Sequence, residues 1–205
     1  MEHDDMHYKT NITSIPVCIN EHVIYLYGEI TSPEDYTNVF GVLEEAMDDD
    51  VITLKISSPG GDLNTALEMY GAIKNCKANV KGVINSDCSS AASMIFLACD
   101  EWDVGPFAQM LVHEVSYGVY GKHSDNYDAT LSYQSHFKNI ISSVYKGFLS
   151  ERDLLDVSRG KQLYLTADEI TCRLVAMLES TLERLKQQEG GSNDKCENGN
   201  IQNDS

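Results

Sequence analysis

The sequence predicts an α/β fold in one domain, because strand-like and helix-like stretches take turns along the chain. Four short stretches alternate apolar and polar residues as strands do, at 23–30, 51–56, 80–84 and 110–113. Apolar residues at helical spacing occupy the stretches between and after them, at 36–47, 64–75, 92–98 and 127–148. With 205 residues, 42% of them apolar, the chain is long enough to bury one core.

The second strand and the helix after it are joined by a turn that could bind a ligand. The strand runs directly into Ser58-Pro59-Gly60-Gly61-Asp62, and apolar residues at helical spacing begin at Leu63. Because glycine has no Cβ, other groups can approach this backbone closely and meet its N–H groups. The turn is either an ordinary strand-to-helix connection or one wall of a site.

The most informative stretch follows the third strand. Ser86-Asp87-Cys88-Ser89-Ser90-Ala91-Ala92-Ser93-Met94 gathers small residues around Ser93, and an apolar helix is expected from there to residue 98. A nucleophilic serine needs its hydroxyl on a tight turn, and the two alanines let neighbouring backbone come close. The N–H groups at the start of the helix, Met94 nearest among them, can stabilise an oxyanion. Plain core packing is the alternative.

The fourth strand ends in a histidine, in the segment Gln109-Met110-Leu111-Val112-His113. An imidazole changes its charge near neutral pH, so it can serve as a general base. A single histidine at a strand end is usually structural. The serine turn upstream makes His113 a catalytic candidate.

The order of these three motifs resembles the proteolytic subunit of the Clp protease family, a serine peptidase with a crotonase-like fold. The resemblance extends roughly from Val23 to Ala176, with residues 23–30 similar to the first core strand of that family and 164–169 similar to its late turn-and-helix motif. It implies Ser93 as nucleophile, His113 as general base, and an oxyanion hole formed by the backbone N–H groups of Gly61 and Met94.

One position departs from the family pattern. Counted from the late motif, the place of the triad aspartate falls on Gln162. A glutamine amide oxygen can accept a hydrogen bond from an imidazole, but it has no charge to stabilise the imidazolium. Either the Gln162 amide oxygen holds the imidazole in the right tautomer, or Asp156 or Asp168 takes the role of the triad aspartate after a local shift in register.

The resemblance also implies an assembly. Clp-type subunits form stacked homo-oligomeric rings that enclose the active sites and receive protein substrates from an ATP-dependent unfoldase. The chain contains no Gly-x-x-x-x-Gly-Lys-Ser/Thr motif, so ATP hydrolysis by that route would fall to a partner. The predicted long helix at 127–148 has a broad apolar face for packing or for ring assembly, and it is expected to protrude from the domain. The departures suggest a divergent member, of virus or prophage type.

Composition excludes several other classes of protein. A net charge of −17 argues against binding to nucleic acid or to an anionic membrane, because phosphate contacts need clustered Lys and Arg. There is no apolar run of roughly 15–20 residues, so no signal peptide or membrane span is expected and the protein is predicted to be cytoplasmic. The six cysteines lack metal-ligand spacing, which predicts reduced thiols, no metal and no cofactor.

The expected organisation has three parts: a polar N-terminal segment at 1–20, a peptidase domain at 21–186 and a disordered polar tail at 187–205. Two other functions remain open. One is a catalytically weak or inactive Clp-like ring subunit, which Gln162 favours. The other is a crotonase-fold enzyme that acts on a thioester, against which the pairing of Ser93 with His113 counts.

Overall fold

A computed structural model describes residues 19–116 and 122–193 and contains one mixed sheet. The sheet order is β1-β2-β3-β5-β6, with β4 also paired to β3; every pair is parallel except the antiparallel β5–β6 pair. The strands are β1 (Glu21–Tyr27), β2 (Val51–Ser58), β3 (Asn79–Ser89), β4 (Glu101–Val104), β5 (Gln109–Val112) and β6 (Leu163–Thr166).

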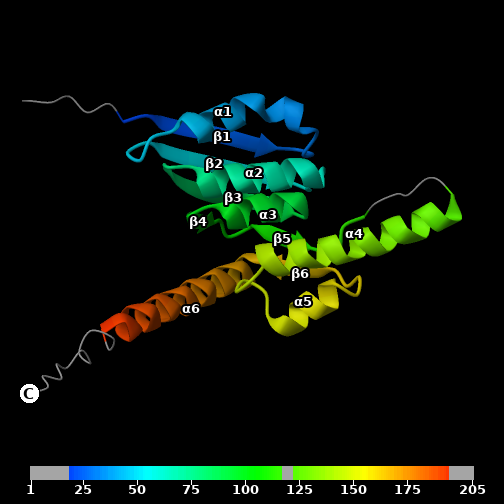
Figure 1. Ribbon diagram of the computed structural model, residues 1–205. Helices are drawn as coiled ribbons and strands as arrows, with labels where there is room; N and C mark the ends of the chain where they lie inside the picture. Colours follow the sequence, from blue (N-terminus) through cyan, green and yellow to red (C-terminus); the bar gives the residue numbers. More distant parts are fainter. Residues whose placement is uncertain (1–18, 117–121, 194–205) are drawn as a thin grey trace, which may run out of the picture.

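Helices α1 (Thr37–Glu45), α2 (Leu63–Asn75) and α3 (Ala91–Ala98) lie on one face of this sheet (Figure 1). The side chains that point toward these helices form the core, and strand β2 shows the pattern most clearly, since Ile52, Leu54 and Ile56 are buried while the residues between them are partly exposed. All eight residues of α3 are buried, so this helix passes through the middle of the core.

The α/β prediction is confirmed, and each expected strand and helix has a counterpart. Strand β3 continues to Ser89, five residues beyond the expected end. Its pairing with β2 shifts register between Ile56 and Ser58, where an irregularity adds residues to β3. Such an irregularity interrupts the alternation of side chains, so the end of the strand was not visible in the pattern.

The long helix α4 (His123–Val144) packs on the core at only one end. Ile140 and Ile141 near its C-terminus are buried, as are Tyr145 and Phe148 in the turn that follows, whereas Leu131 is 49% exposed. The earlier part of the helix projects away from the sheet (Figure 1). The expected apolar face therefore packs against the core only in the last turns of α4, and it is exposed in the turns before them.

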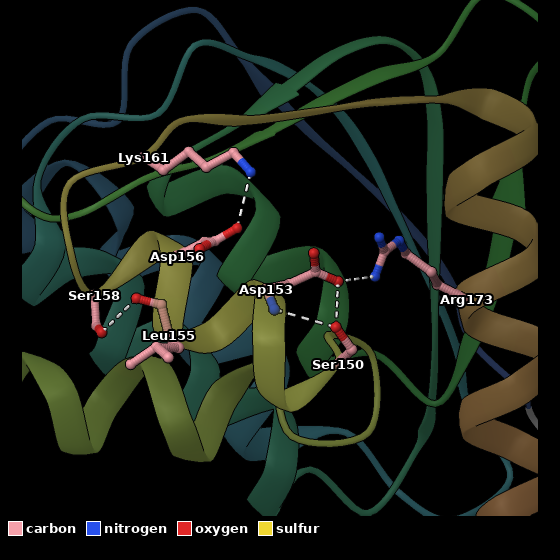
Figure 2. A network of polar contacts seen from close by, with 7 residues as sticks. All are labelled: Ser150, Asp153, Leu155, Asp156, Ser158, Lys161 and Arg173. Atoms are coloured by element: carbon pink, nitrogen blue, oxygen red, sulfur yellow. Dashed lines mark hydrogen bonds and ion pairs between the residues drawn. The ribbon is translucent and has the colours of Figure 1, made fainter.

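Helix α6 (Ala167–Asn193) begins within the late turn-and-helix motif at 164–169. Two helical elements were not expected: a short 3-10 turn (Pro33–Tyr36) and helix α5 (Glu151–Val157). Ser150 caps α5 by accepting from the Asp153 N–H, and Asp153 accepts from Arg173 of α6 at 2.9 Å (Figure 2). Burial acts to raise the pKa of Asp153, but its hydrogen bonds from Ser150 and Arg173 outweigh this and lower it. This ion pair ties the base of α6 to α5.

Helix α6 runs to Asn193, past residue 187, where the polar tail was expected to begin. Lys186 and Gln187 are good helix formers, and they extend a helix that is already established by Leu174 and the exposed Leu178, Leu182 and Leu185. The expected N-terminal segment, apart from its last two residues, and the end of the tail at 194–205 lie outside the described residues. Within the described ranges, no helix combines the length and apolar character needed to cross a membrane.

Candidate active site

The Pro-Gly-Gly turn connects β2 to α2 and is fixed by hydrogen bonds on both sides. The Ile30 N–H donates to the Gly60 carbonyl, and the Asp62 N–H donates to the Ile30 carbonyl, each at 2.8 Å. Asp62 then caps α2 by accepting from the Thr65 N–H at 2.8 Å. Gly61, between these bonds, has φ +148° and is exposed, so its N–H belongs to a rigid and accessible turn.

This turn lies directly against the serine turn at the end of β3. A Cβ on Gly60 would sit 2.7 Å from the Ser90 Cβ, 2.7 Å from the Ser89 carbonyl oxygen and 3.0 Å from the Ala91 nitrogen. Only glycine fits there, because real Cβ atoms do not approach other atoms so closely. The two turns that the sequence singled out therefore form one site.

Ser90 has the most unusual backbone in the described part of the chain. Its φ of 54° and ψ of −123° make it the only residue other than glycine with positive φ among those described. Such a conformation costs about 1–3 kcal/mol and persists only where surrounding structure enforces it. Ser90 is partly exposed and immediately precedes α3. A sharp, strained strand-to-helix turn of this kind presents a serine hydroxyl for attack on a carbonyl.

Ser93, the serine that the sequence favoured, lies three residues further on in the first turn of α3 and is fully buried. Its hydroxyl donates to the Ser90 carbonyl at 2.7 Å, and its Oγ is 2.6 Å from the Tyr145 hydroxyl. Both neighbours are protein groups, so in this conformation a substrate carbonyl has no access to the Ser93 hydroxyl.

The two expected oxyanion-hole donors, the N–H groups of Gly61 and Met94, lie in different surroundings. Gly61 borders the site as expected, but Met94 is the fourth residue of α3 and is buried. The first four N–H groups of a helix have no partner inside the helix. Ala91 is the first residue of α3 and adjoins the glycine turn. Its N–H is therefore a second candidate donor beside that of Met94.

Sequence patterns alone could not single out Ser90. Three small residues precede the alanines, Ser89 and Ser90 among them, and sequence patterns could not tell which of the serines ended the strand. The positive φ of Ser90 is a property of the folded backbone, and residue types alone do not predict it.

His113 directly follows β5, as expected, and is partly exposed. Strand β5 is parallel to β3 with Ser89 opposite Leu111, and the Ser90 N–H donates to the Leu111 carbonyl at 2.7 Å. The serine turn and the histidine are therefore joined through β5, with His113 two residues beyond the point of contact. Within the described residues, the imidazole has no hydrogen-bond partner.

Gln162 and His113 each adjoin the last residue pair of strands β5 and β6. Strands β5 and β6 pair with Val112 opposite Leu163, so the next pair in this register is His113 and Gln162. The Gln162 side chain is exposed, and its amide oxygen accepts from the Tyr164 hydroxyl at 2.9 Å. The register supports the expected location of Gln162, although its oxygen is directed to Tyr164.

The two alternative aspartates have other contacts. The Asp156 carboxylate forms a 2.8 Å ion pair with Lys161 (Figure 2), and this hydrogen bond lowers the pKa of Asp156. Asp168 is an exposed residue in the first turn of α6, where an acidic side chain stabilises the helix dipole. Neither carboxylate forms a hydrogen bond with His113 in the described part of the chain.

A cavity of about 420 Å³ opens beside the residue that follows His113. Its walls come from α4 and α5 and include both apolar and charged groups, namely Glu114, Leu131, Phe137, Lys138, Ile141 and Val157. A cavity of this size can accept one amino-acid side chain.

Two of the described cysteines pack in the core. Cys88 and Cys99 are buried in the core, and burial raises the pKa of Cys99 to about 12 and that of Cys88 well above its ordinary value. Thiols of this kind stay protonated and are poor nucleophiles. Cys76, Cys88, Cys99 and Cys172 are free thiols, while Cys18 and Cys196 lie outside the described residues.

Comparison with known proteins agrees with the fold and with the family resemblance. Residues 7–169 match the family model of Clp protease. The chain is 28% identical over 156 residues to the ATP-dependent Clp protease proteolytic subunit 1 of Corynebacterium glutamicum, which covers 73% of this chain and 74% of that protein. The structure of a ClpP1 point mutant from Listeria monocytogenes has the same fold, with a TM-score of 0.59 and 21% identity over 76% of this chain and 87% of that one. Because the family model matches most of its length, the chain belongs to the Clp protease family.

Proposed function

We propose that this protein is a serine endopeptidase whose nucleophile is Ser90, with His113 as general base and an oxyanion hole formed by the Gly61 and Ala91 N–H groups. The observation that carries the proposal is the strained, partly exposed backbone of Ser90 at the start of α3, packed against Gly60. Ser93 with Met94 is the alternative that the sequence favoured, and it would require the first turn of α3 to open.

The chemistry follows from these positions. His113 removes the proton from the Ser90 hydroxyl as it attacks the substrate carbonyl, and later returns a proton to the leaving amine. The carbonyl oxygen becomes negative in the tetrahedral intermediate, and the two N–H groups stabilise it at no reorganisation cost because both turns are rigid. The cavity beside Glu114 would hold one substrate side chain.

The test of this function is hydrolysis of short fluorogenic peptides that differ in the residue before the scissile bond. The proposal expects turnover that is lost after treatment with a fluorophosphonate, which reacts with activated serines. Hydrolysis that persists unchanged in the modified protein would contradict a serine mechanism.

The second candidate is a Clp-like subunit with weak activity, and Gln162 favours it. Opposite His113, an amide can orient the imidazole but cannot balance its charge. In the Asp-to-Asn case of another serine protease, the carboxylate is worth about 10⁴-fold in turnover. Restoring a carboxylate at this position should therefore raise activity.

Gln162→Asp is expected to raise kcat/KM, by an amount that approaches about 10⁴-fold if the shorter side chain reaches His113 and less if it does not. The Tyr164 hydroxyl competes for the new carboxylate, so Gln162→Asp/Tyr164→Phe should gain further. Asp156→Ala and Asp168→Ala serve as matched comparisons. A loss of activity in either alanine variant, together with no gain from Gln162→Asp, would identify that aspartate as the third member of the triad.

The open face of the sheet supports assembly. Sheets of parallel strands usually have both faces covered, but here the side opposite α1–α3 leaves Val23, Tyr25, Tyr27 and Val51 between 41% and 62% exposed. Tyr25 packs edge-on against Tyr27 and has Lys55 over its ring. We propose that a second subunit covers this face in a homo-oligomeric ring, and that substrates reach the chamber from an ATP-dependent unfoldase in the cytoplasm.

Light scattering should therefore give a mass several times that of the 22.8 kDa chain. Tyr25→Glu is expected to shift the mass towards that of a monomer, because it places a charge in the proposed interface. Leu155→Glu, at a similarly exposed site on α5, is the control. A wild-type monomer at micromolar concentration would contradict ring assembly.

A further inference from the structure

Helix α6 carries an apolar stripe that is open to solvent. Four large apolar side chains on this helix are 46–55% exposed, namely Val175, Leu178, Leu182 and Leu185. They are separated by three, four and three residues, which is the spacing of the positions that meet in the seam of a coiled coil. Ile170 and Leu174, which pack in the core, are buried and lie outside this series. The stripe is therefore distinct from the face by which α6 packs on its own domain.

The first part of the stripe borders a groove. The groove has a volume of about 480 Å³ and is lined by residues 100–104, at and beside strand β4, and by Thr171, Leu174, Val175 and Leu178 of α6. Beyond the groove α6 projects away from the sheet (Figure 1), and Leu182 and Leu185 continue the stripe there. A second helix that lies along the stripe would therefore have one end in the groove.

The strand side of the groove is acidic. Asp100, Glu101 and Asp103 are exposed and line it, and among the described residues only Lys81 forms an ion pair with any of them, at 3.4 Å from Asp103. Carboxylates beside an apolar stripe favour an occupant that has both apolar residues and a basic one.

Helix α6 itself has this combination of side chains. Its Arg184 lies between Leu182 and Leu185 in the sequence and donates only to neighbours on the helix, the Ser180 carbonyl at 3.2 Å and the Thr181 hydroxyl at 3.1 Å. In the part of the chain that the structure describes, the Arg184 guanidinium forms no ion pair with a carboxylate. A second α6 would therefore bring both apolar residues and a free cation to the groove.

A second copy of α6 that runs in the opposite direction matches the stripe. When the two helices pair about a two-fold axis, Val175 faces Leu185 of the second copy and Leu178 faces its Leu182, and each pairing occurs twice. All four exposed apolar residues then lie in the contact. The distal half of each helix, which projects from its own domain, occupies the groove of the other copy.

The same direction brings opposite charges together. Arg184 of the second copy then lies level with Ala176, on the same flank of the stripe as Leu174, which is the flank beside β4. Its long side chain can reach the carboxylates of that strand. In a parallel pair Arg184 would lie six residues beyond Leu178, about 9 Å further along the axis, and the two domains would meet at the groove.

We infer that α6 is a docking helix for a second copy of this chain, which binds antiparallel along the exposed stripe with Arg184 beside the acidic strand β4. The inference goes beyond the proposed function, because it requires neither catalysis nor a contact through the open face of the sheet. Isolated helices of this length are marginal in water. Here the domain holds the first turns of α6 in place through the buried Leu174 and the Arg173–Asp153 ion pair, which lowers the entropy cost of docking.

The test uses the full chain with Cys18, Cys172 and Cys196 replaced by serine, in one version with Leu178→Cys and in another with Leu182→Cys. Mixed and mildly oxidised, the two versions should form a disulfide-linked dimer that contains one chain of each, because the two positions face each other. Neither version should crosslink with itself, because identical positions are offset by about 6 Å along the axis. The serine-substituted chain without a new cysteine is the blank.

Charge substitutions test the stripe and the acidic strand separately. Leu185→Glu in both versions should lower the yield of the mixed dimer at least about tenfold, because it places a charge in the seam. Arg184→Glu should lower it several-fold, because it places a carboxylate beside those of β4. Ser180→Glu, an equal change of charge at an exposed position on the opposite face of α6, is the matched control and should leave the yield unchanged.

Three results would overturn the inference. Crosslinking of each version with itself would mean that the helices pair in parallel, and an unchanged yield in Leu185→Glu would mean that the stripe is not in the contact. No crosslink in the folded mixture would mean that another occupant covers the stripe. Failure of the proposed function is a separate result, because a protein that does not react with a fluorophosphonate should still form the mixed dimer.

Discussion

Ser90→Ala should abolish peptide hydrolysis, with a loss of at least about 10³-fold in kcat. Removing the nucleophile leaves only the oxyanion hole and substrate binding, which support little turnover. The fold should be retained, because Ser90 is partly exposed and its hydroxyl makes none of the contacts that hold the turn. Alanine keeps the Cβ that packs against Gly60.

Ser93→Ala provides the comparison, measured as kcat on the same peptide. We expect a loss of one to two orders of magnitude there, short of the complete loss in Ser90→Ala. The reverse order, with Ser93→Ala inactive and Ser90→Ala active, would restore the assignment that the sequence favoured and would show that α3 opens during catalysis.

The second large effect is expected for Gly61→Ala. A Cβ on Gly61 would lie 2.1 Å from the Ile30 carbonyl oxygen, and φ of +148° is a conformation that L-residues rarely adopt. The turn must move, and with it the Gly61 N–H. Loss of one oxyanion-hole donor costs about 10²–10³-fold in kcat, which is the expected decrease.

Gly41→Ala is the control for this substitution. Gly41 lies within α1 with open space around its Cβ position, so alanine should leave kcat unchanged and stabilise the helix by up to about 1 kcal/mol. Circular dichroism of both variants separates a local change from unfolding. Wild-type kcat in a folded Gly61→Ala variant would exclude Gly61 from the oxyanion hole.

The sequence predicted the fold class and the motifs that meet in the site, because these depend on local patterns. Glycines at 60 and 61 and a histidine at a strand end are visible as residue types, and their order along the chain places them at the same edge of a sheet. Local patterns could not decide whether Ser90 or Ser93 lies in the turn before α3, because the two serines are only three residues apart. That position follows from a register irregularity in β3 and from the positive φ of Ser90, which only the folded backbone shows.

Long-range contacts were likewise beyond the sequence patterns. Tyr145 was assigned to an apolar face, and nothing in the chain showed that its hydroxyl would meet Ser93 across 52 residues. The ion pair of Asp156 with Lys161 occupies a carboxylate that sequence counting left available to His113. Gln162 is the exception, because the β5–β6 register supports the location that counting gave it.

Labelling with a fluorophosphonate, followed by mass-spectrometric location of the adduct, tests the central claim most directly. The reagent bonds only to a serine oxygen that a base and an oxyanion hole activate, so it reports the nucleophile without a known substrate. Fragment ions distinguish Ser90 from Ser93 within one peptide. The account predicts a single adduct on Ser90, lost in Ser90→Ala and in His113→Ala. An adduct on Ser93, or none on the folded wild-type protein, would contradict it.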